Sequence, residues 1–250
     1  MRRGLVIGNW KMSVNRQSAI ELVDAIIANL AVTSAEVVVC PPYLYIPEVS
    51  QHIKNTDLVI GAQNVAAHET GAYTGEISAR MLKEFNCKYA IVGHSECRAY
   101  SDYTNISVAK RFCLAVAEGI IPILSTTETL AERESGKTFD VIAEQLNAVI
   151  DMAGIESFKN AVLSYEPLWA IGTGKTATGE QAQEVHGFIR QLIADKNPDI
   201  AHNIQILYGG SVKPDNVQDL LKMPDIDGVL VGGASLSADS FLKIYSSFQK

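Results

Sequence analysis

Short, largely apolar runs recur along the chain about every 32 residues, the length of one strand–helix–strand advance. The runs occupy residues 5–7, 36–40, 58–61, 89–92, 121–124, 161–165, 204–208 and 228–231. Apolar residues follow one another in these runs instead of alternating with polar ones, which is typical of parallel strands buried on both faces. The pattern therefore predicts eight buried parallel strands.

Between these runs, apolar residues recur at i, i+3 and i+4, which predicts helices. The clearest such segments are residues 18–30, 106–118, 139–150 and 179–194. Eight strand–helix units in 250 residues predict an α/β fold, a single-domain (β/α)8 barrel over residues 1–250. A doubly wound open sheet is the competing architecture, but it usually has fewer strands, and no G-x-G-x-x-G follows the first run.

The charge balance narrows the class of ligand. The formal net charge is −7, which argues against general binding to nucleic-acid backbones but leaves room for one small anionic substrate. The four cysteines have neither C-x-x-C nor zinc spacing, so we expect reduced thiols in a cytoplasmic protein. The apolar run after the first residues is too short for a signal peptide, and no stretch reaches the length of a membrane span.

Glycine pairs follow the last two predicted strands, at Gly209-Gly210-Ser211 and at Gly232-Gly233. Glycine lets backbone N–H groups turn toward an anion, and this corner of a (β/α)8 barrel is a frequent phosphate site. The two turns therefore indicate a phosphate-binding site. Tight turns without any ligand are the alternative.

Three further polar residues follow predicted strands and could carry chemistry. Glu166 is a candidate general base, or a carboxylate paired with a lysine. His94 is a candidate acid, base or electrophile, or a histidine with a purely structural role. Lys11 is a candidate anion-binding cation, or a solvated surface lysine. Because the carboxyl ends of barrel strands meet at one rim, we expect the three to converge there.

Seven segments together resemble the triosephosphate isomerase family, in the order that the family has them. They are NWKM (9–12), GAQN (61–64), GAYTGE (71–76), GHSE (93–96), YEPLWAIGTGK (165–175), YGGSV (208–212) and VGGASL (231–236). The resemblance implies a TIM barrel that interconverts dihydroxyacetone phosphate and D-glyceraldehyde 3-phosphate through an enediol(ate), in glycolysis and gluconeogenesis. It implies no metal or organic cofactor. A diverged phosphate-binding paralogue with weak or no isomerase activity remains the alternative.

The family's roles carry over to matching positions. Glu166 is similar to the base that moves a proton between C1 and C2, and His94 to the neutral electrophile that polarises the carbonyl. Lys11 resembles the cation that attracts the substrate dianion, and Asn9 the hydrogen-bond donor to the developing oxyanion. Glu96 matches a family site residue whose role stays open.

The resemblance also implies a phosphate site, a lid and a homodimer. Gly172, Ser211, Gly232 and Gly233 would bind the phosphate, together with Asn9 and Lys11. The residues that resemble the mobile lid are Pro167, Leu168, Trp169, Ala170, Ile171, Gly172, Thr173, Gly174 and Lys175. Thr74, Gly75 and Glu76 resemble the loop that each subunit inserts into its neighbour. A phosphorylated triose and a second copy of the chain are thus the implied partners, with no nucleic acid and no membrane.

Several residues depart from the family pattern. Ser125 and Thr127 stand where cysteine and glycine are usual, Cys97 where arginine is common, and Ser13 where asparagine is common. The segment that begins at Tyr103, residues 103–106, stands where an acidic segment is usual. A buried hydroxyl without a partner, or a β-branched residue at positive φ, would cost stability. We therefore expect Ser125 and Thr127 to lower stability without touching the proton-transfer geometry.

Other phosphate-binding barrels are a further class of enzyme to consider. An aldolase or a ketose-phosphate isomerase would lack the segment 165–175. Many aldolases also need a Schiff-base lysine at the carboxyl end of a strand. Lys88 precedes its predicted strand and so points to the opposite rim.

Overall fold

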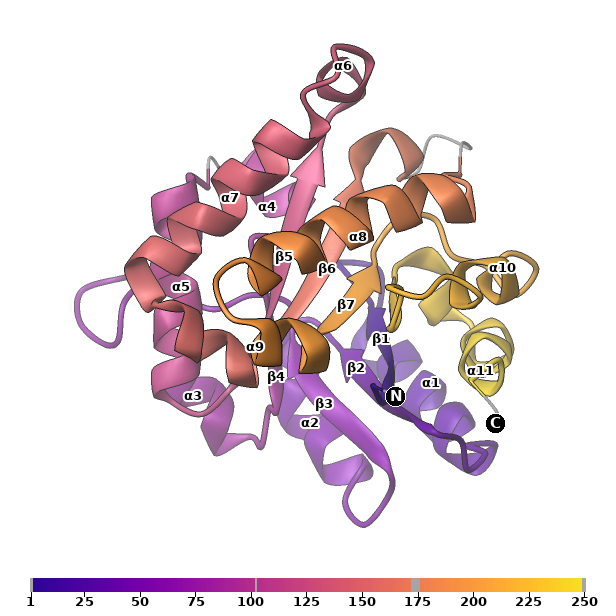
Figure 1. Cartoon of the computed structure of the whole chain (residues 1–250). Coiled ribbons are helices and arrows are strands. Elements are labelled where there is room, and N and C mark those ends of the chain that lie inside the picture. The colour runs from indigo at the N-terminus through magenta and orange to yellow at the C-terminus, as the bar shows by residue number, and fades with distance from the viewer. Residues whose placement is uncertain (1, 102, 172–175, 249–250) are drawn as a thin grey trace.

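The computed structural model describes residues 2–101, 103–171 and 176–248. Eight parallel strands form a closed barrel in which each strand pairs with the next and β8 pairs with β1, while helices surround the outside (Figure 1). The strands are β1 (Gly4–Asn9), β2 (Ala35–Cys40), β3 (Leu58–Ala62), β4 (Tyr89–Val92), β5 (Ile121–Glu128), β6 (Val162–Pro167), β7 (Gln205–Tyr208) and β8 (Gly228–Val231). The predicted (β/α)8 barrel is confirmed.

The four predicted helices are present, with ends shifted by no more than a few residues. They are α1 (Arg16–Ala28), α5 (Asn105–Ala117), α7 (Thr138–Ala153) and α8 (Gly179–Ala194). The other helices are α2 (Ile46–His52), α3 (Ala79–Glu84), α4 (Ser95–Tyr100), α6 (Leu130–Glu134), α9 (Pro198–Asn203), α10 (Val217–Leu221) and α11 (Ala238–Ser246). The 3₁₀ segments are η1 (Tyr43–Tyr45), η2 (Ile155–Asn160), η3 (Leu168–Ala170) and η4 (Gly233–Leu236). Within the described ranges, no helix is long and apolar enough to cross a membrane.

Local sequence explains where the long helices begin and end. Asn15 caps α1 by accepting from the backbone N–H of Ser18, whose side chain caps the N–H of Asn15 in return. Thr178 and Gln181 form the same reciprocal pair at the start of α8. The helix α7 ends at Gly154, whose φ of 75° suits glycine and stops the helix.

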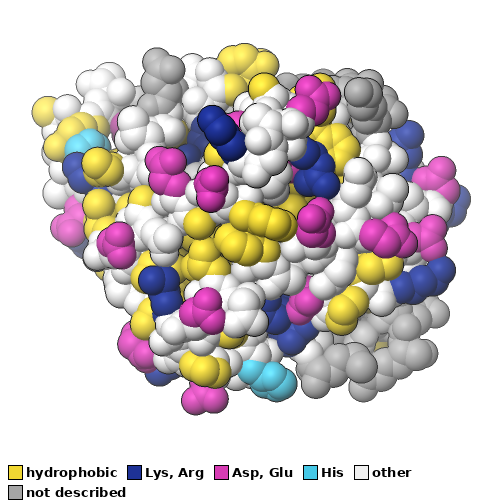
Figure 2. Space-filling model, turned by 45° about the horizontal axis from the view of Figure 1, so that its top comes forward, with side chains coloured by type: hydrophobic (Ala, Val, Ile, Leu, Met, Phe, Trp, Pro, Cys, Tyr) yellow, Lys and Arg dark blue, Asp and Glu magenta, His cyan; other side chains and the backbone are white. Residues whose placement is uncertain are grey.

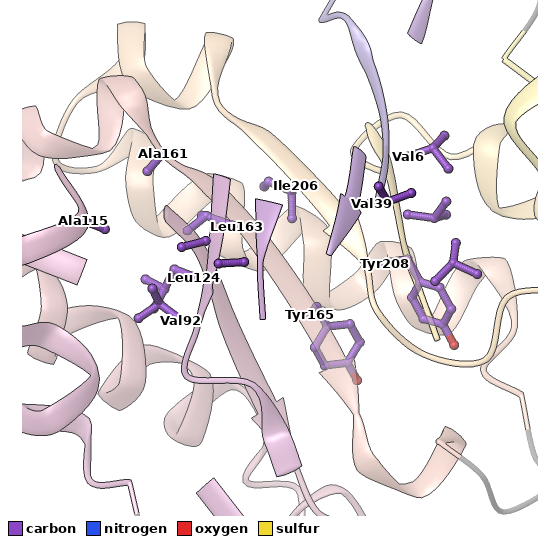
Figure 3. Packing of buried hydrophobic residues seen from close by; sticks show 14 of the residues in the cluster. Val6, Val39, Val92, Ala115, Leu124, Ala161, Leu163, Tyr165, Ile206 and Tyr208 are labelled. Atoms are coloured by element: carbon purple, nitrogen blue, oxygen red, sulfur yellow. The ribbon is translucent and has the colours of Figure 1, made fainter. Parts of the chain in front are cut away.

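The core has two layers, which explains why the strands are apolar without alternation. One cluster consists only of strand residues and fills the inside of the barrel; Leu5 and Ile7 of β1 belong to it. The other lies between the strands and the helices, and Val6 of β1 belongs to that cluster. Figure 3 shows part of this second layer, with Tyr165 and Tyr208 among its residues. Neighbouring residues on one strand are therefore both buried, on opposite faces.

Strand β5 is longer than the apolar run that predicts it. The run ends at residue 124, whereas β5 continues to Glu128 and pairs with β6 throughout this extension. The extension is polar, but its hydroxyls bond to β6: Thr126 Oγ1 donates to the Ser164 carbonyl at 3.1 Å. Pairing and these hydroxyl bonds maintain the strand where hydrophobicity does not. Strand β6 likewise includes Glu166, which the sequence placed just after a strand.

Candidate active site

A cavity of about 410 Å³ opens at the carboxyl ends of the strands. Residues from five separate parts of the chain line it, at or after the ends of β1, β4, β6, β7 and β8: Asn9, Lys11, His94, Ile171, Ser211, Gly232 and Gly233. The predicted convergence of Lys11 and His94 at one rim is thus present in the fold. On the face shown in Figure 2, Lys and Arg side chains lie scattered among Asp and Glu side chains.

Lys11 is held in a strained backbone conformation beside this cavity. Its φ is 51°, a region that non-glycine residues rarely adopt, at a cost of about 1–3 kcal/mol. Its N–H donates to Asn9 Oδ1 at 3.1 Å, and its carbonyl accepts from Gln63 Nε2 at 2.9 Å. The ammonium pairs with Glu96 Oε1 at 2.7 Å. The strain is therefore compensated by local bonds that fix the lysine at the cavity wall.

His94 has a defined tautomer. It caps helix α4, and its Nδ1 accepts a hydrogen bond from the backbone N–H of Glu96 at 3.2 Å. A nitrogen that accepts an N–H carries no proton, so the proton of the neutral ring resides on Nε2. That Nε2 lies 3.6 Å from Glu166 Oε2. The ring can therefore act as a neutral hydrogen-bond donor toward the centre of the site.

Glu166 is fully buried and both of its carboxylate oxygens accept hydrogen bonds. Oε2 accepts from the backbone N–H of Ser95 at 2.9 Å, and Oε1 accepts from Ser125 Oγ at 2.5 Å. One interpretation of the sequence pairs Glu166 with a lysine. Within the described chain its hydrogen-bond donors are two serines instead. Gly209 makes room for the side chain, since a Cβ there would lie 2.7 Å from Glu166 Cγ. The carboxylate lies beside His94, whereas the described cavity wall does not include it.

From the sequence we expect Ser125 and Thr127, on β5, to lower stability, and both reasons for that expectation are wrong. The Ser125 hydroxyl has a partner, and that partner is Glu166. Thr127 is not among the described residues with positive φ, and its Oγ1 donates to the Glu166 carbonyl at 2.8 Å. Gln145 completes the cradle by bonding to both the N–H and the carbonyl of Thr127. The two residues therefore support Glu166 instead of lying apart from it.

The predicted phosphate corner is arranged as two turns around the cavity. The N–H of Ser211 donates to the Ala170 carbonyl at 3.1 Å, so this N–H is occupied in the present conformation. A Cβ on Gly233 would meet nothing within 4 Å, and one on Gly232 would lie 3.4 Å from Lys11 Cε. The corner is thus open at Gly233 and adjoins the lysine. Both interpretations of these turns, a phosphate site or ligand-free turns, are compatible with this geometry.

The first part of the predicted lid, residues 167–171, is described, and residues 172–175 lie outside the described chain. Ile171 lines the cavity, and Trp169 Nε1 donates to Glu128 Oε1 at 3.1 Å. The sequence assigned no role to Glu128. The only hint of a role in the sequence is that Glu128 follows two threonines at the end of a strand. The hydrogen-bond partners of Glu128 are evident only from the fold.

Glu128 is a fully buried carboxylate with several donors. Tyr165 OH donates to Oε1 at 2.6 Å, Arg133 donates to the same oxygen at 3.1 Å, and Thr138 Oγ1 donates to Oε2. Burial opposes ionisation, but these bonds outweigh it and hold the pKa of Glu128 below its usual value. Burial, followed by the bond to Glu128, raises the pKa of Tyr165. This cluster anchors the start of the predicted lid.

The predicted dimer loop, Thr74, Gly75 and Glu76, is exposed between β3 and α3. Gly75 has a φ of 89°, which glycine tolerates, and a Cβ there would meet nothing within 4 Å. The loop projects from the molecule, and Glu76 pairs with Arg111 at 3.5 Å.

Tyr103 and Cys97 also depart from the family pattern: Tyr103 contacts Arg111, the partner of Glu76, and Cys97 lies on helix α4. Arg111 stacks over the ring of Tyr103 with 4.0 Å from its Cζ to the ring centroid, and Asn64 donates to the Tyr103 hydroxyl. Tyr103 thus packs against Arg111 at a position where the resemblance implied an acidic residue. Cys97 is half-buried, and burial raises the pKa of its thiol. Among the described residues, no group of three or more His, Cys, Asp or Glu side chains could hold a metal ion.

Comparisons with known proteins agree with this geometry. A family model described as triosephosphate isomerase matches residues 4–248. A triosephosphate isomerase from Methylococcus capsulatus is 53% identical over 247 residues, which is 99% of each chain. Relatives of the same name from Shewanella sediminis and Nitrosomonas eutropha are 49% and 50% identical, and cover 98% and 97% of this chain and 97% of their own lengths. The chain belongs to the triosephosphate isomerase family.

Proposed function

We propose that this protein is an isomerase that interconverts dihydroxyacetone phosphate and D-glyceraldehyde 3-phosphate. The observation that carries the proposal is the placement of the buried Glu166 carboxylate 3.6 Å from the protonated Nε2 of His94, next to a cavity lined by Lys11. A base, a neutral proton donor and a cation are the three groups that enolisation of a phosphorylated ketone requires.

In this mechanism Glu166 takes the proton from C1 of dihydroxyacetone phosphate. As the C1–H electrons form the enediolate, negative charge develops on the C2 oxygen, and the Nε2 proton of His94 moves to that oxygen. The ring then takes the C1 hydroxyl proton, and Glu166 returns its proton to C2, which yields the aldehyde. Atoms and protons balance, and no cofactor takes part.

Glu166 must leave its present contacts to do this. Its carboxylate is bonded to Ser95 and Ser125 and is not part of the cavity wall. A rotation of the side chain toward His94 and the cavity brings it to the substrate carbon.

Lys11 and Asn9 would stabilise the charge of the substrate and of the enediolate. Lys11 is already fixed at the wall by its strained backbone and by its bond to Glu96. Gly172, Ser211, Gly232 and Gly233 would bind the phosphate. Release of the Ser211 N–H from Ala170 would accompany lid movement, since Ala170 belongs to the lid segment.

The lid 167–175 would exclude water, because an exposed enediolate could expel its phosphate. The loop Thr74–Glu76 would insert into a second copy of the chain to give a homodimer; its exposure supports that assignment. We place the enzyme in the cytoplasm, in glycolysis and gluconeogenesis.

A coupled assay of the purified protein with each triose phosphate tests the proposal directly. Turnover in both directions supports it. Binding of phosphate without turnover would instead indicate a diverged phosphate-binding paralogue. Soaking crystals with phosphoglycolate tests the phosphate site separately; density only away from Ser211, Gly232 and Gly233 would contradict that assignment.

A further inference from the structure

The polar extension of β5 lies directly beside Glu166. In the register of the two strands, Ser125 is opposite Ser164 and Thr127 is opposite Glu166. Ser125 and Ser164 are both fully buried, but their hydroxyls differ. Ser125 Oγ donates to Glu166 Oε1, whereas Ser164 Oγ has no hydrogen-bond partner among the described residues. The fold thus presents two matched serines, only one of which touches the carboxylate.

We propose that Ser125 is a positioning residue for Glu166: its hydroxyl holds the carboxylate ionised and outside the cavity between turnovers. This inference rests on the proposed function, in which Glu166 is the base.

The geometry of the contact supports an anionic acceptor. The distance of 2.5 Å is in the range of O–H···O⁻ bonds, which are shorter and stronger than bonds between neutral groups. A hydroxyl has one proton to donate, and Ser125 donates it to Oε1 of Glu166. A bond to the charged form of a carboxylate favours that form. Ser125 therefore keeps the base ready to accept a proton while it waits.

The bond from Ser125 also fixes the position of the Glu166 carboxylate between turnovers. The Ser125 hydroxyl donates to Oε1 and the backbone N–H of Ser95, the first residue of α4, donates to Oε2, so two donors on different elements hold the group in place. The Thr127 hydroxyl fixes the backbone of Glu166 by donating to its carbonyl. Glu166 must break the bond to Ser125 to reach the substrate, and reforms it after each turnover.

Three other charged or titratable groups interact with Glu166. His94 Nε2 faces Oε2 at 3.6 Å, not the oxygen that Ser125 binds. Cys97 and Arg98, on α4, interact with Glu166 electrostatically. A Ser125 substitution leaves all three groups in place, so the effect of the hydroxyl can be measured against a constant background.

The test compares Ser125→Ala with Ser164→Ala, its matched control, through kcat/KM as a function of pH. Loss of the donor makes the ionised carboxylate less favourable in the free enzyme. We expect the acid limb of the profile to move to higher pH by about one unit in Ser125→Ala, and to stay in place in Ser164→Ala. Ser125→Cys, which keeps the volume but donates weakly, should move the limb by a smaller amount in the same direction.

An unmoved acid limb in folded Ser125→Ala, or an equal shift in Ser164→Ala, would overturn the proposal. If Ser125→Ala does not fold, Ser125→Cys decides, and an unmoved limb there overturns it as well. A second readout does not depend on turnover: the infrared carboxylate band that disappears in Glu166→Gln. Its loss on acidification should begin at higher pH in Ser125→Ala than in wild type. A wild-type enzyme without turnover would refute the proposed function, while this band still tests the contact.

Discussion

The two ends of the barrel use charged side chains in different ways. At the amino ends of the strands, charges pair with one another: Arg190 bonds to Asp225 at 2.5 Å and to Asp227 at 2.7 Å, and Asp227 also bonds to Arg2. At the carboxyl ends, Lys11 lines a cavity and takes a strained φ of 51°. At the amino end these charges bond to one another, whereas at the carboxyl end Lys11 pairs with Glu96 and also lines a cavity that a substrate can fill.

The two buried histidines show the same division. His186, on α8, donates from Nδ1 to the Asp225 carbonyl at 3.1 Å, and burial lowers its pKa to about 4. His94 lines the cavity, with its Nε2 proton directed toward the site. Both rings are neutral, but only one has a proton placed for transfer. Burial and polarity alone therefore do not mark a catalytic group, because His186 has both and faces a backbone carbonyl, whereas His94 faces the cavity.

Glu166→Asp should lower activity strongly, and it tests the base at the carboxyl end of the barrel. Removing one methylene retracts the carboxylate by about 1 Å, which lowers kcat by about 10²-fold, while KM and thermal stability change little. Steady-state kinetics with both triose phosphates measure this. An Asp variant with wild-type kcat would refute the assignment of Glu166 as the base.

Arg190→Met tests the amino end. The change keeps an apolar stem but removes the bonds to Asp225 and Asp227, and also those to the carbonyls of Ala201 and Ile204. We expect the free energy of unfolding to fall by about 2 kcal/mol, because bonds to charged groups are lost in a largely buried site. Urea unfolding measures it. The kcat/KM value should stay within about twofold; a large loss of activity would break the contrast between the two ends.

The pH dependence of stability tests His186. Its pKa is about 4 in the folded chain, against about 6.5 when unfolded, so between these values the unfolded state binds more protons. Stability therefore falls as pH drops from about 6.5 toward 4, by about 1 kcal/mol between pH 6.5 and 5.5.

The variant His186→Asn isolates this contribution. The Asn amide can still donate to the Asp225 carbonyl, but it does not titrate. Urea unfolding at the two pH values should show a smaller loss of stability in the variant than in wild type. An equal loss in both proteins would assign the pH dependence to other groups.

The strands could be predicted from the sequence because they are buried on both faces. Each apolar run reports that burial directly, and the runs match the observed strands closely. The extension of β5 could not be predicted in this way, since Ser125, Thr126 and Thr127 remain in the strand through pairing and hydroxyl bonds to β6. A pattern of hydrophobicity carries no information about such bonds.

The candidate site shows the same limit. Lys11, His94 and Glu166 belong to motifs that the sequence displays. Ser125 and Glu128 matter because of which side chains lie across from them, and that depends on the register between strands. The expectation that Ser125 is an unpartnered hydroxyl was wrong for this reason: its partner is 41 positions away in the sequence.

Trp169→Phe should have a small effect, and it tests whether Glu128 acts on the lid segment or on the barrel. The phenyl ring can still pack on Arg133, whose Cζ lies 5.2 Å from the indole centroid, but it cannot donate to Glu128. Glu128 keeps its bonds to Tyr165, Arg133 and Thr138. The change therefore removes the bond between Glu128 and the start of the predicted lid and leaves the rest of the cluster in place. A single lost hydrogen bond at a half-buried position changes the lid's resting position by a small free energy, and we expect kcat/KM to fall about threefold with little change in melting temperature. Kinetics and thermal unfolding of the same preparation measure both. A loss of stability without any change in kcat/KM would show that Glu128 acts on the barrel, like the ion pairs at the amino end, and not on the lid.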